Sequence, residues 1–256
     1  TLLEMLLSKN KSVLSLGEVV NTLKSIRSDE QKEKICPLCG VRVKKCSFWS
    51  ACVDEIKISE SLREAFKSLK NYITQERQEA YVVDSSKRLK DLLQHYNPGT
   101  GDVKVIFLVR DVRGWVQSIE AAHNRDNVKR YGFGLLVNSY VWMFSFLKRK
   151  RALDSHGYDY FLVSYEDLAL KPTATMGSIL NFMGLEEKNY DMSEPSRSHN
   201  VEGNRMRFYF QKESDIAYDY KWFSDLRHSI YFPVVFPVHY LNSKILRKLT
   251  GNPSEK

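Results

Sequence analysis

The stretch Val105-Ile-Phe-Leu-Val-Arg-Asp-Val-Arg-Gly-Trp-Val-Gln-Ser118 is a short apolar run that stops abruptly at two charged residues. A run of this length that is rich in β-branched residues predicts a buried strand. The residues after it predict a helix start, with Asp111 as the cap and Ser118 about two turns along the helix. Arg110 would then lie at the C-terminal end of a parallel strand, where open α/β sheets bind ligands.

Arg110 and Ser118 together suggest a phosphate site. A guanidinium fork at the end of a strand, with a serine hydroxyl on the following helix, suits a bound phosphate. A structural salt bridge is the alternative role for Arg110. The segment alone does not decide between these roles.

The rest of the chain alternates predicted strands with predicted helices. Further strands are predicted over residues 79–84 and 158–164. Helices are predicted over residues 1–7, 17–26, 59–73, 86–96, 133–153 and from Pro172 to Gly184. This alternation predicts an α/β fold in which helices flank a doubly wound parallel sheet. Residues 231–245 are apolar and aromatic, and predict a C-terminal helix or packing arm.

The bulk composition bounds the answer without fixing it. A chain of 256 residues fits one domain, or one domain with an inserted cap. No apolar run reaches the roughly 18 residues of a membrane span. The net charge of +8 fits an anionic ligand, a polyanionic acceptor or nucleic acid, and also a plain basic surface. A peripheral membrane contact is a second role for residues 231–245.

All four cysteines of the chain lie close together in the sequence. They are Cys36, Cys39, Cys46 and Cys52. A Cys-x-x-Cys pair with two nearby thiols could bind zinc, although the wider spacing of the second pair weakens that signal. Two disulfides or four free thiols are the alternatives. In each case we expect the cluster to be structural.

Several blocks accompany the opening segment in a fixed order. They are Ser15-Leu-Gly-Glu18, Cys36-Pro-Leu-Cys-Gly40, Cys46-Ser-Phe-Trp49, Val82-Val-Asp-Ser-Ser-Lys87, Phe161-Leu-Val-Ser-Tyr-Glu-Asp-Leu168, Asn181-Phe-Met-Gly-Leu185 and His199-Asn-Val-Glu-Gly-Asn-Arg-Met-Arg-Phe208. With these blocks the chain resembles the sulfotransferases that use 3′-phosphoadenosine 5′-phosphosulfate (PAPS). It is most similar to their bacterial-type branch, and more distantly to tyrosylprotein and carbohydrate sulfotransferases. The resemblance runs from Thr1 to about Trp222.

The resemblance implies a P-loop-containing nucleoside triphosphate hydrolase-like fold. It implies a single sulfotransferase domain over residues 1–256, with a Cys-rich cap over residues 29–58 and a packing arm over residues 209–256. Thr1 would be the last residue of the phosphosulfate loop, so the loop and the first strand are expected upstream. PAPS should then bind well only when that loop is present.

The resemblance also implies roles for individual residues. Arg110 and Ser118 would hold the 3′-phosphate of PAPS, and Asn204 and Arg207 would be cofactor or lid residues. Glu18 would be the catalytic base, and a carboxylate that only stabilises the helix dipole is the alternative.

Two further residues are assigned to the reaction by the same resemblance. Lys87 would stabilise the charge of the leaving phosphate. An exposed lysine that follows a helix cap at Ser85 or Ser86 is the alternative. His199 is a second candidate base, or a structural histidine.

The expected activity is transfer of a sulfuryl group from PAPS to a hydroxyl or amine acceptor, with no metal in the chemistry. Carbohydrate, tyrosine and small-molecule acceptors all stay open, and no nucleic-acid partner is expected. One alternative is a P-loop kinase that uses ATP. The other is a catalytically dead relative that binds polyanions through Lys148-Arg-Lys-Arg151. The sequence leaves the compartment open between the cytoplasm and the Golgi lumen.

Overall fold

The computed structural model describes residues 2–28, 34–76, 79, 81–100, 102–125, 134–187, 190–194, 196–203 and 216–250. The protein is α/β, as the alternation predicted, and the strands within these residues form two small parallel sheets. The chain divides into two compact units. The first contains residues 1–97 and 176–216, and the second contains residues 98–175 and 217–256. The P-loop architecture stays a prediction.

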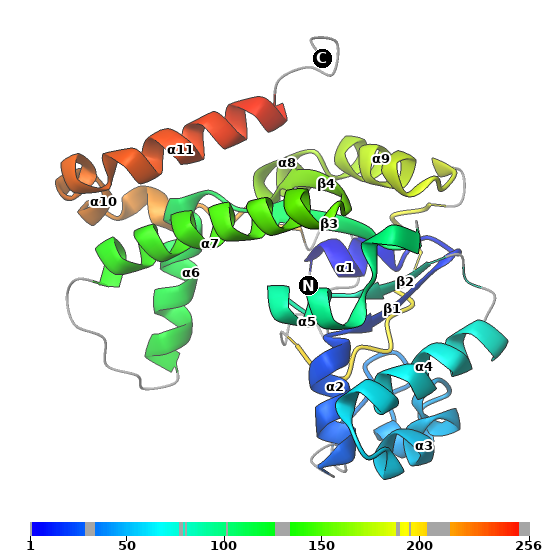
Figure 1. The fold of residues 1–256 in the computed structure, drawn as a ribbon. Coiled ribbons are helices and arrows are strands. Elements are labelled where there is room, and N and C mark those ends of the chain that lie inside the picture. The colour runs from blue at the N-terminus through cyan, green and yellow to red at the C-terminus, as the bar shows by residue number, and fades with distance from the viewer. Residues whose placement is uncertain are drawn as a thin grey trace. The chain divides into compact units, whose positions relative to one another are not determined.

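The sheet of the first unit pairs β1 (Val13–Gly17) with β2 (Tyr81–Asp84) in parallel. All five residues of β1 are buried. The crossover between the two strands is helical, and its three helices pack on one another (Figure 1). They are α2 (Val19–Arg27), α3 (Val53–Ile58) and α4 (Leu62–Glu76). The unit also holds α1 (Leu2–Leu7) and α5 (Leu89–His95).

A late segment of the chain lies along β1. Ser198 forms a parallel bridge with Ser15, and the backbone N–H of His199 donates to the carbonyl of Ser15 at 2.9 Å. Residues 198–200 are buried. The segment therefore satisfies backbone groups that β1 does not share with β2.

The cysteine-rich region packs into the core of the first unit. The core there contains Leu23 and Ile26 of α2 and Ile56 of α3, all fully buried. Phe48 and Trp49 are equally buried among them. They follow η2 (Val43–Lys45), and Trp49 opens η3 (Trp49–Ala51). The described part of the predicted cap is thus continuous with the core of this unit.

The second unit is built around β3 (Lys104–Val109) and β4 (Asp159–Ser164), which pair in parallel register from Lys104↔Asp159 to Val109↔Ser164. A short helix precedes β3, two long helices run between β3 and β4, and further helices follow β4 (Figure 1). These elements are η4 (Pro98–Thr100), α6 (Val112–Arg125), α7 (Gly134–His156), α8 (Tyr165–Leu170), η8 (Lys221–Ser224), α10 (Arg227–Ile230) and α11 (Phe232–Thr250).

The C-terminal helix α11 packs on α7, α6 and β4. It buries Val235 and Val238 and leaves Phe236 and Tyr240 exposed. Among the described helices, none is both long and apolar enough to cross a membrane. A peripheral membrane contact of this helix stays a prediction.

Helix α9 (Pro172–Met183) agrees with its sequence prediction. Met176, Ile179 and Leu180 recur at helical spacing and are fully buried. Gly184 ends the helix at φ +75°, a conformation that glycine adopts without strain. Among the described elements, the sequence did not predict strand β1, the short α-helices α3, α8 and α10, or the short 3-10 helices.

Candidate functional site

Glu18 and Lys87 form an ion pair at the carboxyl ends of β1 and β2. The Nζ atom of Lys87 lies 2.9 Å from Oε1 of Glu18. The Glu18 side chain is 16% exposed and that of Lys87 is 67% exposed. Asn21 donates from Nδ2 to the second carboxylate oxygen at 2.6 Å. Two residues that the sequence assigned to the same reaction are thus in contact.

The loop after β2 supplies the cap of α2. Oδ1 of Asp84 accepts from the backbone N–H of Val19, and the Ser86 hydroxyl accepts from that of Val20. Glu18 stands at the N-cap position, but its carboxylate makes no capping hydrogen bond. Because the cap is provided from β2, the Glu18 carboxylate is available for other chemistry.

The contacts of Glu18 decide its charge. Burial on its own would raise the pKa of this carboxyl group, but the hydrogen bond and positive charge of Lys87 and the amide of Asn21 outweigh it and lower the pKa. Glu18 is therefore ionised at neutral pH. Without the Lys87 contact, the Glu18 carboxylate would become more basic.

A buried carboxylate, which the sequence analysis missed, lies behind this edge. Glu4 of α1 is 3% exposed. Its oxygens accept from the hydroxyls of Ser15 at 2.5 Å and Ser85 at 2.9 Å, and from the Asn200 amide at 3.0 Å. These donors join β1, the loop after β2 and the late segment along β1.

Gly17 allows the late segment to approach β1 closely. Its φ of +72° favours glycine, and a Cβ atom there would stand 2.0 Å from Oδ1 of Asn200. A Cβ atom on Gly203 would stand 3.7 Å from Oε1 of Glu18. The segment from residue 198 to residue 203 therefore lines the surroundings of Glu18.

Arg110, in the second unit, follows the last residue of β3 as predicted. Its Nη2 atom lies 3.0 Å from Oδ2 of Asp219, and its guanidinium stands 4.6 Å from the centre of the Tyr165 ring. The side chain is 20% exposed. The salt bridge that was the alternative role for Arg110 is therefore present, and part of the fork stays open to solvent.

Gly114 explains how Arg110 reaches the face of α6 that carries Ser118. A Cβ atom on Gly114 would stand 3.1 Å from Nε of Arg110. Gly114 and Ser118 are four residues apart and share one helix face. Ser118 is exposed. The structure thus places the Arg110 guanidinium beside Gly114, one turn before Ser118 along α6.

Asp111 caps α6, as predicted, and anchors a buried network. Its Oδ1 accepts from the backbone N–H of Arg113 at 2.8 Å, and the guanidinium of Arg113 donates to both carboxylate oxygens. Asn242 of α11 donates to Oδ2 at 3.2 Å. Arg113 also stacks over Trp222 at 3.8 Å. Glu166 accepts from the Asp111 N–H, and burial raises its pKa.

Replacing Asp111 with asparagine should destabilise the second unit by about 1.5–3 kcal/mol near neutral pH. Burial would raise the pKa of Asp111, but the hydrogen bonds and charge of Arg113 lower it overall. Because the pKa of Asp111 is lower in the folded protein than in the unfolded chain, its charge stabilises the fold at any pH above the unfolded-state pKa of about 4. This stabilisation is lost as the pH falls through the folded-state pKa.

The difference between wild type and Asp111→Asn in urea unfolding should therefore shrink as the pH drops below about 4. Asp154→Asn removes an exposed pair with Lys150 and is the matched control. It should change unfolding little at any pH. A pH-independent difference for Asp111→Asn would show that its charge does not matter.

Three cysteines and His199 converge in the first unit. Nδ1 of His199 lies 3.5 Å from Sγ of Cys36, 3.6 Å from that of Cys39 and 3.3 Å from that of Cys46. The Sγ atoms of Cys39 and Cys46 are 3.6 Å apart. All four ligand-type atoms lie within 4.8 Å of one another. His199 is thus surrounded by sulfur, which favours its structural role over that of a base.

Cys52 lies outside this group. It is buried, its Sγ faces the carbonyl of Trp49 at 3.7 Å, and burial raises its pKa to about 12. All four cysteines belong to the described residues, and none of them forms a disulfide. In the remaining cluster, the hydrogen bond between Cys36 and Cys46 lowers the pKa of Cys46 and raises that of Cys36.

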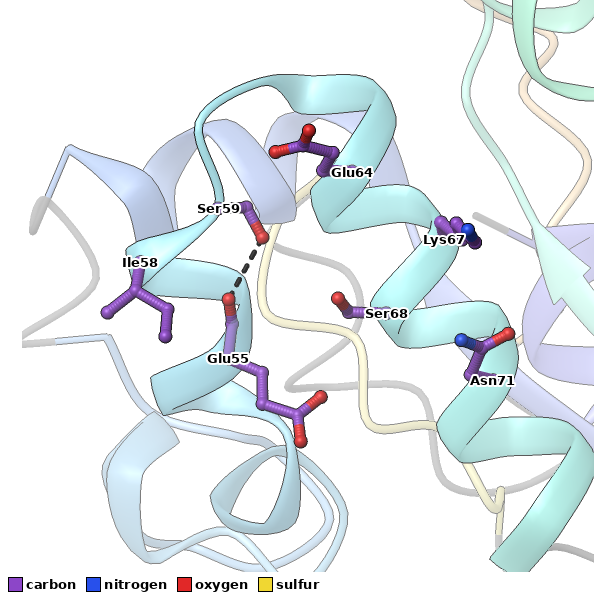
Figure 2. A pocket seen from close by; sticks show the side chains of 7 residues that line it. All are labelled: Glu55, Ile58, Ser59, Glu64, Lys67, Ser68 and Asn71. Atoms are coloured by element: carbon purple, nitrogen blue, oxygen red, sulfur yellow. Dashed lines mark hydrogen bonds between the residues drawn. The ribbon is translucent and has the colours of Figure 1, made fainter.

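A shallow pocket of about 400 Å³ lies elsewhere in the first unit, between α3 and α4 (Figure 2). Its lining consists of Glu55, Ile58, Ser59, Glu64, Lys67, Ser68 and Asn71. None of these is a predicted site residue. Thr1, Asn204 and Arg207, which the sequence assigned to the cofactor, lie outside the described residues.

In comparisons with protein-family models, curated proteins and solved structures, no match to this chain was found.

Proposed function

We propose that this protein is a PAPS-dependent sulfotransferase in which Glu18 is the base. The contact between Glu18 and Lys87 carries the proposal. Sulfuryl transfer needs a carboxylate to take the acceptor's proton and a cation to stabilise the leaving group, and this edge of the sheet supplies both. They stand at the carboxyl ends of parallel strands, where α/β proteins bind ligands.

In the proposed reaction, the acceptor oxygen attacks the sulfur of PAPS. The bond from sulfur to the bridging oxygen breaks, and its electron pair leaves with the 5′-phosphate of adenosine 3′,5′-bisphosphate. The acceptor proton passes to the Glu18 carboxylate. Lys87 stabilises the charge that develops on the leaving phosphate. Much of the rate enhancement comes from positioning these groups, by analogy with phosphoryl transfer.

The ion pair gives Glu18 a way to change its basicity during the reaction. Lys87 is largely exposed, so its side chain can turn toward a bound phosphosulfate. Lys87 lowers the pKa of Glu18, whereas burial raises it. When the anionic cofactor draws Lys87 away, the carboxylate becomes a stronger base at the moment that a proton must be taken.

Arg110 supports the choice of PAPS over ATP. A 3′-phosphate distinguishes the two nucleotides, and the partly open Arg110 fork on the face of α6 that carries Ser118 suits such a group. Asp219 holds this fork before ligand binding. A phosphate would then share or replace the Asp219 contact.

The test is transfer of label from ³⁵S-PAPS to a panel of carbohydrate, tyrosine-peptide and phenolic acceptors, with the full-length protein. We expect labelled product, and inhibition by adenosine 3′,5′-bisphosphate that is stronger than inhibition by ATP. Calorimetry supplies a measurement that does not depend on the acceptor. Affinity for adenosine 3′,5′-bisphosphate no greater than for AMP would rule out the proposal.

Transfer of the γ-phosphate of ATP would instead indicate a kinase. Binding of heparin without turnover, abolished by neutral substitutions in Lys148-Arg-Lys-Arg151, would indicate a polyanion-binding protein.

A further inference from the structure

The cluster of Cys36, Cys39, Cys46 and His199 has the dimensions of a tetrahedral metal site. Bonds of about 2.3 Å from zinc to sulfur and about 2.0–2.1 Å to nitrogen place two sulfurs roughly 3.8 Å apart and a sulfur and a nitrogen roughly 3.6 Å apart. The sulfur–nitrogen distances here are 3.3, 3.5 and 3.6 Å, and the Cys39–Cys46 distance is 3.6 Å. Four of the six separations are therefore close to those of a tetrahedral zinc site, and all six are within 4.8 Å.

We propose that these four residues hold a structural zinc ion. Three thiolates and one imidazole are a closed, four-coordinate ligand set of the kind that structural zinc sites use. Soft sulfur ligands select zinc over magnesium and calcium, which prefer oxygen. The proposal does not depend on the sulfotransferase activity. It replaces the four-cysteine set considered from the sequence, because His199 takes the place of Cys52.

The backbone around the first two ligands directs both sulfurs to one point. The N–H of Gly40 donates to the carbonyl of Cys36 at 2.9 Å, which closes a turn. Gly40 adopts φ +67°, so glycine completes that turn without strain. Ile35 and Arg42 then pair as an antiparallel bridge. Cys36 and Cys39 thus project from one rigid turn.

The block that follows the third ligand holds the fourth in place. Phe48 stacks on the His199 ring, with centroids 5.5 Å apart. Nε1 of Trp49 donates to the His199 carbonyl at 2.8 Å. The hydroxyl of Ser47 lies 3.3 Å from Sγ of Cys39, where it can donate to a thiolate. Such outer contacts orient metal ligands, and they give the Cys46-Ser-Phe-Trp49 block a physical purpose.

Zinc binding balances in charge and protons. Three thiols release their protons to solvent, and the neutral imidazole coordinates through Nδ1. Two positive charges on zinc and three negative thiolates leave one net negative charge at the centre. Metal binding is accordingly expected to weaken as the pH falls, because protons compete for the sulfurs.

The ion would connect two parts of the chain that are far apart in sequence. Cys36, Cys39 and Cys46 belong to the cysteine-rich region, whereas His199 lies in the segment along β1. That segment continues to Gly203 beside Glu18. Zinc would therefore fix one wall of the Glu18 site without touching the reacting groups.

The experiment measures zinc in the purified full-length protein, prepared without chelator, by mass spectrometry of the metal. We expect one zinc per chain. Cys46→Ser and His199→Ala should lose it. Cys52→Ser should keep it and is the matched control, because Cys52 is a buried cysteine of the same region outside the cluster. His199→Cys should also keep it, as a four-thiolate site.

Cobalt substitution tests the ligands even where a variant folds poorly. Wild type with Co²⁺ should show sulfur-to-cobalt charge transfer and the d–d absorption of a tetrahedral site. In His199→Cys the d–d bands should move to longer wavelength. Identical spectra in the two proteins would remove His199 from the site. A wild-type protein that binds no stoichiometric zinc, or that loses two thiols to a disulfide in thiol counting, would overturn the proposal.

Discussion

Glu18→Gln is expected to lower kcat for sulfuryl transfer by about 10²–10⁴-fold, the range that a positioned general base contributes. Glutamine keeps the shape of the side chain and can still accept from Asn21, but it cannot take a proton. Nucleotide binding should change little, because Lys87 is released rather than removed. The measurement is kcat with saturating PAPS, together with the Kd for adenosine 3′,5′-bisphosphate.

The matched control is Glu55→Gln, an exposed glutamate on the α3–α4 pocket of the same unit. Its kcat should equal that of wild type. A Glu18 that only stabilised the dipole of α2 would cost at most about 1 kcal/mol of stability and little activity. Near-normal kcat in Glu18→Gln would show that another group is the base.

His199 is the competing base, and the zinc proposal separates its two roles. His199→Ala would remove both an imidazole and a metal ligand, so its effect on kcat is ambiguous. His199→Cys keeps a ligand and removes the imidazole. If kcat survives in His199→Cys and collapses in Glu18→Gln, Glu18 is the base. The reverse result would assign the proton transfer to His199.

Local patterns predicted most of the regular structure. The helix from Pro172 to Met183 and the strand that ends at Val109 carry their own periodicity and end signals, so neighbouring residues determine them. Strand β1 was missed because its five residues include a serine and a glycine. Ser15 can be buried in this strand because its hydroxyl donates a hydrogen bond to Glu4. That partner cannot be inferred from the strand itself.

The parts of the candidate site that the sequence predicted are residues that directly follow a strand. Arg110 and Lys87 follow strands that the sequence predicted, whereas Glu18 follows β1, which it did not predict. The metal cluster could not be predicted in full, because Cys46 and His199 are far apart in sequence and only the fold brings them together. Asp219 and Asn242 meet residues 110 and 111 in the same way, across long sequence separations. Such pairings depend on tertiary packing, which a single sequence does not display.

Arg110→Ala is expected to weaken binding of adenosine 3′,5′-bisphosphate by roughly 10-fold to over 100-fold, and binding of AMP far less. A hydrogen bond between charged groups contributes about 1.5–3 kcal/mol, which corresponds to that range. The two ligands differ only in the 3′-phosphate, so the ratio of their Kd values isolates the contact. Calorimetry at fixed ionic strength is the measurement.

Two further variants separate a phosphate contact from a structural salt bridge. Arg227→Ala removes another paired arginine of the second unit and controls for the loss of one positive charge. It should leave the ratio of Kd values unchanged. Asp219→Asn frees the Arg110 fork from its present partner at 3.0 Å. If Arg110 binds the 3′-phosphate, this variant should bind the bisphosphate at least as tightly as wild type does.

A purely structural Arg110 gives the opposite pattern. Both Arg110→Ala and Asp219→Asn would then break the same salt bridge and lower the stability of the second unit by similar amounts. Each variant would also weaken the binding of adenosine 3′,5′-bisphosphate and of AMP equally. Because Asp219 is itself partly exposed, its loss leaves Arg110 with access to solvent and with the Tyr165 ring as a partner. The Arg110 side chain therefore keeps a partner when Asp219 is replaced. Only a role of Arg110 in recognition would make Arg110→Ala weaken bisphosphate binding while Asp219→Asn leaves it unchanged or strengthens it.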